Sequence, residues 1–232
     1  MSKLGQAIED KEPEGKIQRL LDTEDPLSVS NRSRSASILT RVVATELRAK
    51  ERKYLASLLL DRGANINTVD DVYGTALAAA ASRVGTSVVQ VLLDRGAGIN
   101  IVAGKYGTAL AAAALWGRTE NVSLLLKRGA KIDMVGGEYG TALAAAAFGG
   151  SADTVSLLLD RRAKIDAVVD SKYGTALAAA ASGKGTNNVE LLLDRGANIN
   201  MFGGEYSTLR GNATSPGSET VPREQQTTLF LT

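Results

Sequence analysis

Apolar residues recur at intervals of three and four from Ala36 onward, with charged residues between them. This spacing is typical of an amphipathic helix, with one side turned toward a core. A second helix is expected at about residues 51–60, followed by Arg62-Gly63-Ala64. Arginine complements the negative end of a helix, and glycine readily adopts the left-handed conformation that closes it. The pattern therefore predicts a pair of helices over residues 36–67.

The next segments repeat one another. Tyr106-Gly107-Thr108-Ala109-Leu110 leads into a run of alanines, and the same wording begins at Tyr73, Tyr139 and Tyr173, with a broken fifth copy at Tyr206. The steps between these tyrosines are 33, 33, 34 and 33 residues. A fixed period of this length predicts a stack of small units that share one linear core.

Each full copy reads as two helices and a hairpin. The threonine of Gly-Thr-Ala is placed to cap the first helix, and the alanine run favours a narrow helix. A Leu/Val-rich second helix follows and ends at Arg-Gly, except at Arg161-Arg162. A non-glycine residue in that cap costs on the order of 1 kcal/mol. The same copy carries one extra residue within 167–172, so we expect the loosest joint and a displaced hairpin there.

The wording of these copies resembles the ankyrin repeat family. Gly107-Thr108-Ala109-Leu110 and then Leu124-Leu125-Leu126 before Gly129-Ala130 follow the family's pattern. Alanine replaces the family's proline and its first histidine in all four copies. The resemblance covers about residues 36–209. It implies an all-α solenoid of antiparallel helix pairs joined by hairpin loops, with the first helices on the concave side, and it implies protein binding.

The chain divides into four expected parts. Residues 1–35 predict a flexible N-terminal arm, 36–67 a capping helix pair, 68–209 four full repeats and the start of a fifth, and 210–232 a disordered tail. The array stops without an obvious cap. Either the tail folds back over the last repeat, or the chain is a piece of a longer protein, which is the interpretation we favour.

Composition argues against an enzyme. The chain has no histidine and no cysteine, so the commonest general base and the commonest metal ligands are missing. A net charge of +2 is too weak to indicate a nucleic-acid surface. No signal peptide and no run of about 18 apolar residues is visible, which argues against a membrane span. We expect no cofactor, no metal and no small-molecule substrate. The aspartates that precede the arginines at the ends of the second helices are expected to form a structural row.

Positions that differ between the near-identical copies are the candidates for specificity. Two sets stand out: the residues just after the alanine run and the hairpin tips. The predicted partner-binding residues are Arg83, Lys105, Leu115, Trp116, Glu138, Phe148 and Lys172. Leu115, Trp116 and Phe148 fall in adjacent central repeats and should be neighbours, as in the aromatic centre of an interface. The alternative for Trp116 is that it packs over its own helix turn. The tyrosine row is expected to pack between hairpins.

The sequence therefore predicts a non-enzymatic protein-interaction module with a protein partner. Arrays with the wording Gly-x-Tyr-Gly-Thr-Ala-Leu look like those at the recognition ends of fungal NACHT- or STAND-type signalling proteins. The alternatives are an ankyrin scaffold or transcription coregulator, an enzyme that uses Asp, Lys or Tyr, and a structural spacer. The expected compartment is the cytoplasm, with the nucleus as the alternative.

Overall fold

The computed structural model describes residues 36–44, 47–83, 85–183, 186–201 and 203–204. The predicted N-terminal arm, the tail and the broken fifth copy that begins at Tyr206 lie outside these residues. Within the described part, no helix is long and apolar enough to cross a membrane.

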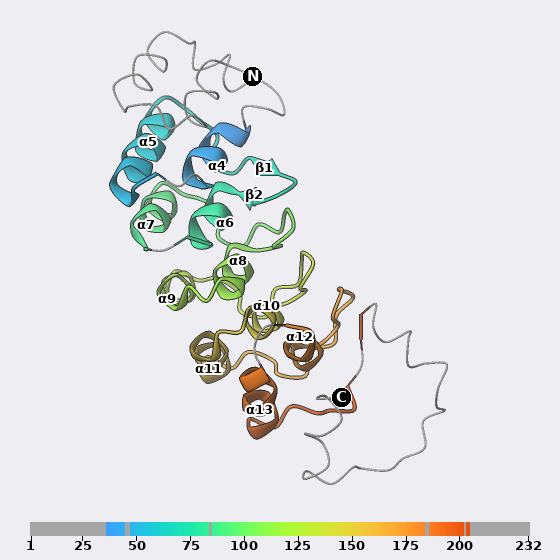
Figure 1. Cartoon of the computed structure of the whole chain (residues 1–232). Helices are drawn as coiled ribbons and strands as arrows, with labels where there is room; N and C mark the ends of the chain where they lie inside the picture. Colours follow the sequence, from blue (N-terminus) through green and yellow to red (C-terminus); the bar gives the residue numbers. More distant parts are fainter. Residues whose placement is uncertain (1–35, 45–46, 84, 184–185, 202, 205–232) are drawn as a thin grey trace.

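Helices alternate between an inner and an outer column (Figure 1). The inner helices are α4 (Ala36–Ala44), α6 (Ala76–Ala81), α8 (Ala109–Leu115), α10 (Ala142–Gly149) and α12 (Ala176–Ser182). The outer helices are α5 (Ala49–Asp61), α7 (Ser87–Asp94), α9 (Thr119–Lys127), α11 (Ala152–Asp160) and α13 (Thr186–Asp194). The short strands β1 (Val69–Asp70) and β2 (Gly74–Thr75) pair antiparallel in the first hairpin. The hairpins project from the inner column, on the side away from the outer helices. This is the helix-pair solenoid that the period predicts.

Threonine caps begin four of the inner helices, as the sequence predicts. The Thr108 hydroxyl accepts a hydrogen bond from the Ala111 backbone N–H at 3.0 Å, and Thr141 accepts one from Ala144 at 3.1 Å. Thr75 and Thr175 make the same contact. Each bond satisfies a backbone donor that the first turn of a helix leaves unpaired.

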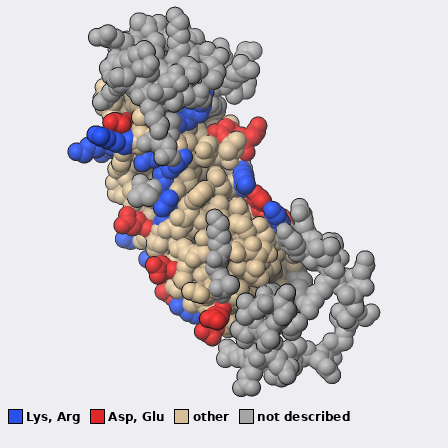
Figure 2. Space-filling view, in the orientation of Figure 1, with Lys and Arg blue, Asp and Glu red and all other residues tan. Residues whose placement is uncertain are grey.

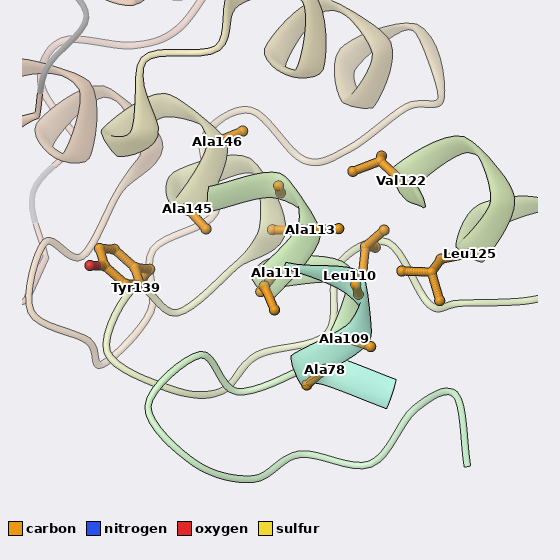
Figure 3. Close-up of a cluster of buried hydrophobic side chains, with 14 of the residues drawn as sticks. Ala78, Ala109, Leu110, Ala111, Ala113, Val122, Leu125, Tyr139, Ala145 and Ala146 are labelled. Atoms are coloured by element: carbon orange, nitrogen blue, oxygen red, sulfur yellow. The ribbon is translucent and has the colours of Figure 1, made fainter. Parts of the chain in front are cut away.

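Alanine fills the space between neighbouring inner helices. All six residues of α6 and the first six of α8 and α10 are buried. Leu110 of α8 points toward Val122 and Leu125 of α9, so the leucine of each inner helix joins its own outer helix to the core (Figure 3). Small side chains on the inner column and larger ones on the outer column agree with the predicted curvature of the stack.

Arginines link the ends of successive outer helices. Arg95 pairs with Asp61 at 2.7 Å, Arg128 with Asp94 at 2.8 Å and Arg195 with Asp160 at 3.0 Å. Each arginine therefore reaches the aspartate of the preceding repeat. These pairs are exposed, and pairs of this kind contribute about 0–1 kcal/mol each. They form a structural row, in agreement with the sequence.

The cap that lacks glycine is strained in the predicted way. Gly129 and Gly196 close α9 and α13 at φ 94° and 92°, and Arg162 closes α11 at φ 66°. Arg162 is the non-glycine residue with positive φ in the described part of the chain.

The extra residue of this repeat does not shift its hairpin, contrary to our expectation. The Lys172 N–H still donates to the Glu138 carbonyl, as the Glu138 N–H donates to Lys105. The loop between Val169 and Gly174 absorbs the insertion, because backbone bonds to the preceding hairpin hold its far end in register.

Candidate protein-binding groove

A concave groove of about 560 Å³ lies between the hairpins and the ends of α8 and α10. Aromatic rings, glycine backbone and one charged side chain surround it. The lining residues are Lys105, Tyr106, Leu115, Trp116, Gly117, Tyr139, Phe148, Gly149, Gly150 and Ser151. Four of the predicted partner-binding residues therefore meet in one place: Lys105, Leu115, Trp116 and Phe148.

Trp116 follows the last turn of α8 and is 52 % exposed, whereas Leu115 beside it is half-buried against the core. Glycine occupies the position of Trp116 in the next repeat, where an ideal Cβ on Gly149 would collide with the Leu115 carbonyl oxygen. The close approach of the two helix ends thus depends on Gly149. It also leaves no side chain at that position to cover the tryptophan ring, which stays open to a partner.

Phe148 forms the aromatic wall of the groove. Its ring centroid lies 5.1 Å from that of Tyr139 and 5.0 Å from that of Tyr173, and the two tyrosine rings stack 5.9 Å apart. Tilted and offset contacts of this kind add to the stability from burial alone. Burial, reinforced by the nearby Glu138 carboxylate, raises the pKa of Tyr139 to about 12, so its phenol is neutral at physiological pH. The rings of the wall therefore pack against one another, and the Tyr139 phenol carries no charge.

Three predicted residues form a charged row along the hairpin tips. The Glu138 carboxylate accepts from Lys105 at 3.3 Å on one side and from Lys172 at 3.2 Å on the other. Partial burial alone would raise the pKa of Glu138, but the hydrogen bonds from Lys172 and Lys105 outweigh it and lower the pKa below its ordinary value. Figure 2 shows red and blue atoms along the hairpin edge and a broad uncharged surface beside it.

Arg83 lies elsewhere. Its guanidinium donates to the Ala44 carbonyl at the end of α4, which ties the second inner helix to the first. Arg83 is not among the residues that line the groove, so its predicted contact with a partner would lie outside it.

Tyr106 and Tyr139 line the groove, although the sequence favoured packing over ligand contact for the tyrosine row. Tyrosine occupies this position in every full copy, and we chose candidate binding residues only among positions that differ between copies. For this reason the two tyrosines were not among the candidates. Gly149, which stands at the position of Trp116 in the following copy, is the sequence feature that could have indicated the open space beside the tryptophan.

Among the described residues, no group of three or more acidic side chains is arranged to hold a metal ion. The groove lining contains no carboxylate. The two converging carboxylates that an enzymatic interpretation requires are therefore not found in this groove. Its chemistry suits the burial of an apolar side chain beside a cation.

A family model described as ankyrin repeats (3 copies) matches residues 46–135 and 133–202. The chain belongs to the ankyrin repeat family. Ankyrin repeats generally mediate protein–protein interactions and are typically non-catalytic. A search of curated proteins found no match to the sequence.

Proposed function

We propose that the groove centred on Trp116 holds a protein partner by one apolar side chain of that partner. The exposed tryptophan beside an aromatic wall is the observation that carries this proposal. Buried aromatic anchors surrounded by neutral contacts dominate the binding energy of many interfaces. The partner's side chain would enter between Trp116 and the Phe148–Tyr139 wall, and Lys105 would favour an acidic residue next to it.

We also propose that this array is the recognition part of a larger signalling protein that acts in the cytoplasm. The hairpin wording Gly-Lys-Tyr-Gly-Thr-Ala-Leu at residues 104–110, which looks like that of fungal NACHT- or STAND-type arrays, supports this second step. It stands independently of the groove, whose test does not depend on it.

Affinity capture with the full chain as bait tests the groove. We compare wild type with the double variant Trp116→Ala, Phe148→Ala. Tyr54→Ala is the matched control, because it removes an exposed aromatic ring from the outer helix α5. Unchanged far-UV circular dichroism would show that the array is intact. A protein captured by the wild type and the control, and lost from the double variant, supports the proposal. A double variant that stays helical and retains every captured protein contradicts it and favours a structural spacer.

A further inference from the structure

An apolar stripe runs along the hairpins, separate from the groove. Its members sit 33 residues apart, in the first half of each hairpin, and are 37–49 % exposed: Val69, Val102, Val135, Val168 and Met201. An ideal Cβ on Gly136 would collide with Val102, and one on Gly203 would meet Val168 at 2.7 Å. These two valines therefore lean over the backbone of the following hairpin. Exposed apolar side chains that gather in a row, instead of being scattered singly, mark an interaction site more often than a bare surface does.

The spacing of the stripe indicates what covers it. Each valine is one repeat from the next, so a covering surface needs apolar groups at the same interval. A second copy of this chain has such a surface by construction. Homo-oligomers most often use a two-fold axis, which places the same patch on both sides of the contact.

The charges at the hairpin tips favour an antiparallel orientation of the second copy over a parallel one. In chain order, the first four hairpins carry Asp71, Lys105, Glu138 and Lys172, whose signs alternate. Asp71 stands one position before Val72, which is the repeat equivalent of Lys105. A two-fold axis between the second and third hairpins reverses this order in the partner. Lys105 then faces the other copy's Glu138, and Asp71 faces its Lys172. A parallel arrangement in register would place each residue against its own copy, with like charges in contact.

The same axis brings the apolar stripe into register. Val102 lies against the partner's Val135, and Val69 against the partner's Val168. The inner charge pair contributes most, because Asp170 also lies in the fourth hairpin and weakens the outer one. Within each copy, Glu138 already binds Lys105 and Lys172. An ammonium group has three donors, so Lys105 can hold its own Glu138 and still reach that of the second copy.

We propose that the hairpin row binds a second copy of this chain, antiparallel, about a two-fold axis between the second and third hairpins. The contact is a narrow stripe. It is therefore expected to be weak, with a dissociation constant of about 1–100 μM rather than that of an obligate dimer.

Sedimentation velocity of the full chain over a concentration series tests the proposal. The wild type is expected to move from monomer to dimer within this range. Lys105→Glu and Glu138→Lys each place like charges across the axis, and each should weaken self-association at least about tenfold. Val102→Ser with Val135→Ser should do the same. Glu120→Lys, a charge reversal on the outer helix α9, is the control and should leave it unchanged.

Mixing the two charge-reversed variants is the decisive step. In a mixed dimer, glutamate at position 105 of one copy faces lysine at position 138 of the other, and the second contact is Lys105 with Glu138 as in the wild type. The like charges within each copy persist, so recovery can come only from contacts between copies. Dimers in the mixture, with each variant alone monomeric, support the proposal. A wild-type monomer at all concentrations, a dimer that neither reversal weakens, or a mixture that stays monomeric would overturn it.

Discussion

Gly149 lies so close to the Leu115 carbonyl oxygen that a Cβ at position 149 would collide with it. This contact joins the ends of α8 and α10 beneath Trp116. In an isolated helix, alanine in place of glycine is stabilising by roughly 0.5–1 kcal/mol. Here the added methyl group forces the two repeats apart. We expect Gly149→Ala to lower the free energy of unfolding by about 1–3 kcal/mol, measured by urea denaturation. A gain in stability would show that the close approach is absent.

The left-handed cap of α11 predicts a stabilising change. Arg162 has φ 66°, a conformation that glycine adopts without strain. We expect Arg162→Gly to raise the free energy of unfolding by about 1 kcal/mol. Arg161→Gly is the control, because Arg161 has φ −90° and gains nothing from glycine. Equal effects of the two changes on the urea midpoint would argue against strain at this joint.

Asn121 is a buried link between repeats. Its side-chain amide donates to the Ala81 carbonyl at 3.0 Å and to the Arg83 carbonyl at 2.9 Å, at the end of the preceding inner helix. Removal of the amide leaves both acceptors without this donor. We expect Asn121→Ala to cost about 1–3 kcal/mol in thermal or urea unfolding. Ser123→Ala on the same helix should change stability by less than about 0.5 kcal/mol. Similar losses for both variants would show that the amide contributes little.

The Glu138 carboxyl gives a pH dependence with a definite sign. Its folded pKa is lower than the ordinary value of 4.5, so the unfolded chain binds more protons. The stability it contributes is fully present above pH 4.5 and is lost as the pH falls through the lower folded pKa. Glu138→Gln should therefore lower the free energy of unfolding in urea by up to about 1 kcal/mol at neutral pH, and have no effect in strong acid.

The control is the same Glu138→Gln change made in a chain that already carries Lys105→Met and Lys172→Met, where the two ion pairs are absent and the pH-dependent difference should disappear. A loss for Glu138→Gln that is the same at both pH values would mean that the ion pairs with Lys105 and Lys172 are not its source.

The sequence predicted the features whose causes are local. The period predicted the helix pairs, and threonine before an alanine run predicted the N-terminal cap of four inner helices. Glycine, or Arg162 in one repeat, predicted where the outer helices end. The link through Asn121 was not predicted, because the position varies: Val88 and Thr154 stand there in two repeats, and only Asn188 of the last repeat makes the same kind of contact, with the Ala147 carbonyl. Only the neighbouring helix end shows what the amide binds. The register of the fourth hairpin likewise depends on backbone bonds to Glu138, which leave no pattern in the residues.

The candidate site divides in the same way. The 33-residue period places Leu115 and Trp116 one repeat before Phe148, which was enough to predict that the three residues are neighbours. Arg83 holds the same repeat position as Trp116, yet it binds the end of α4, because a long side chain there reaches the carbonyl of the preceding helix. The open space beside Trp116 follows from the packing of Gly149, which only the three-dimensional arrangement shows.

Trp116 is the one tryptophan in the chain, so its fluorescence reports directly on the groove. The measurement is a titration of the full chain with a partner obtained by capture, followed by tryptophan emission and acrylamide quenching and, in parallel, by calorimetry. Because the ring is about half exposed before binding, our account predicts a blue shift and a loss of quenching that saturate with the calorimetric isotherm. A partner without tryptophan, or with its tryptophans replaced, keeps the signal specific. Binding by calorimetry with Trp116 emission and quenching unchanged would contradict the account.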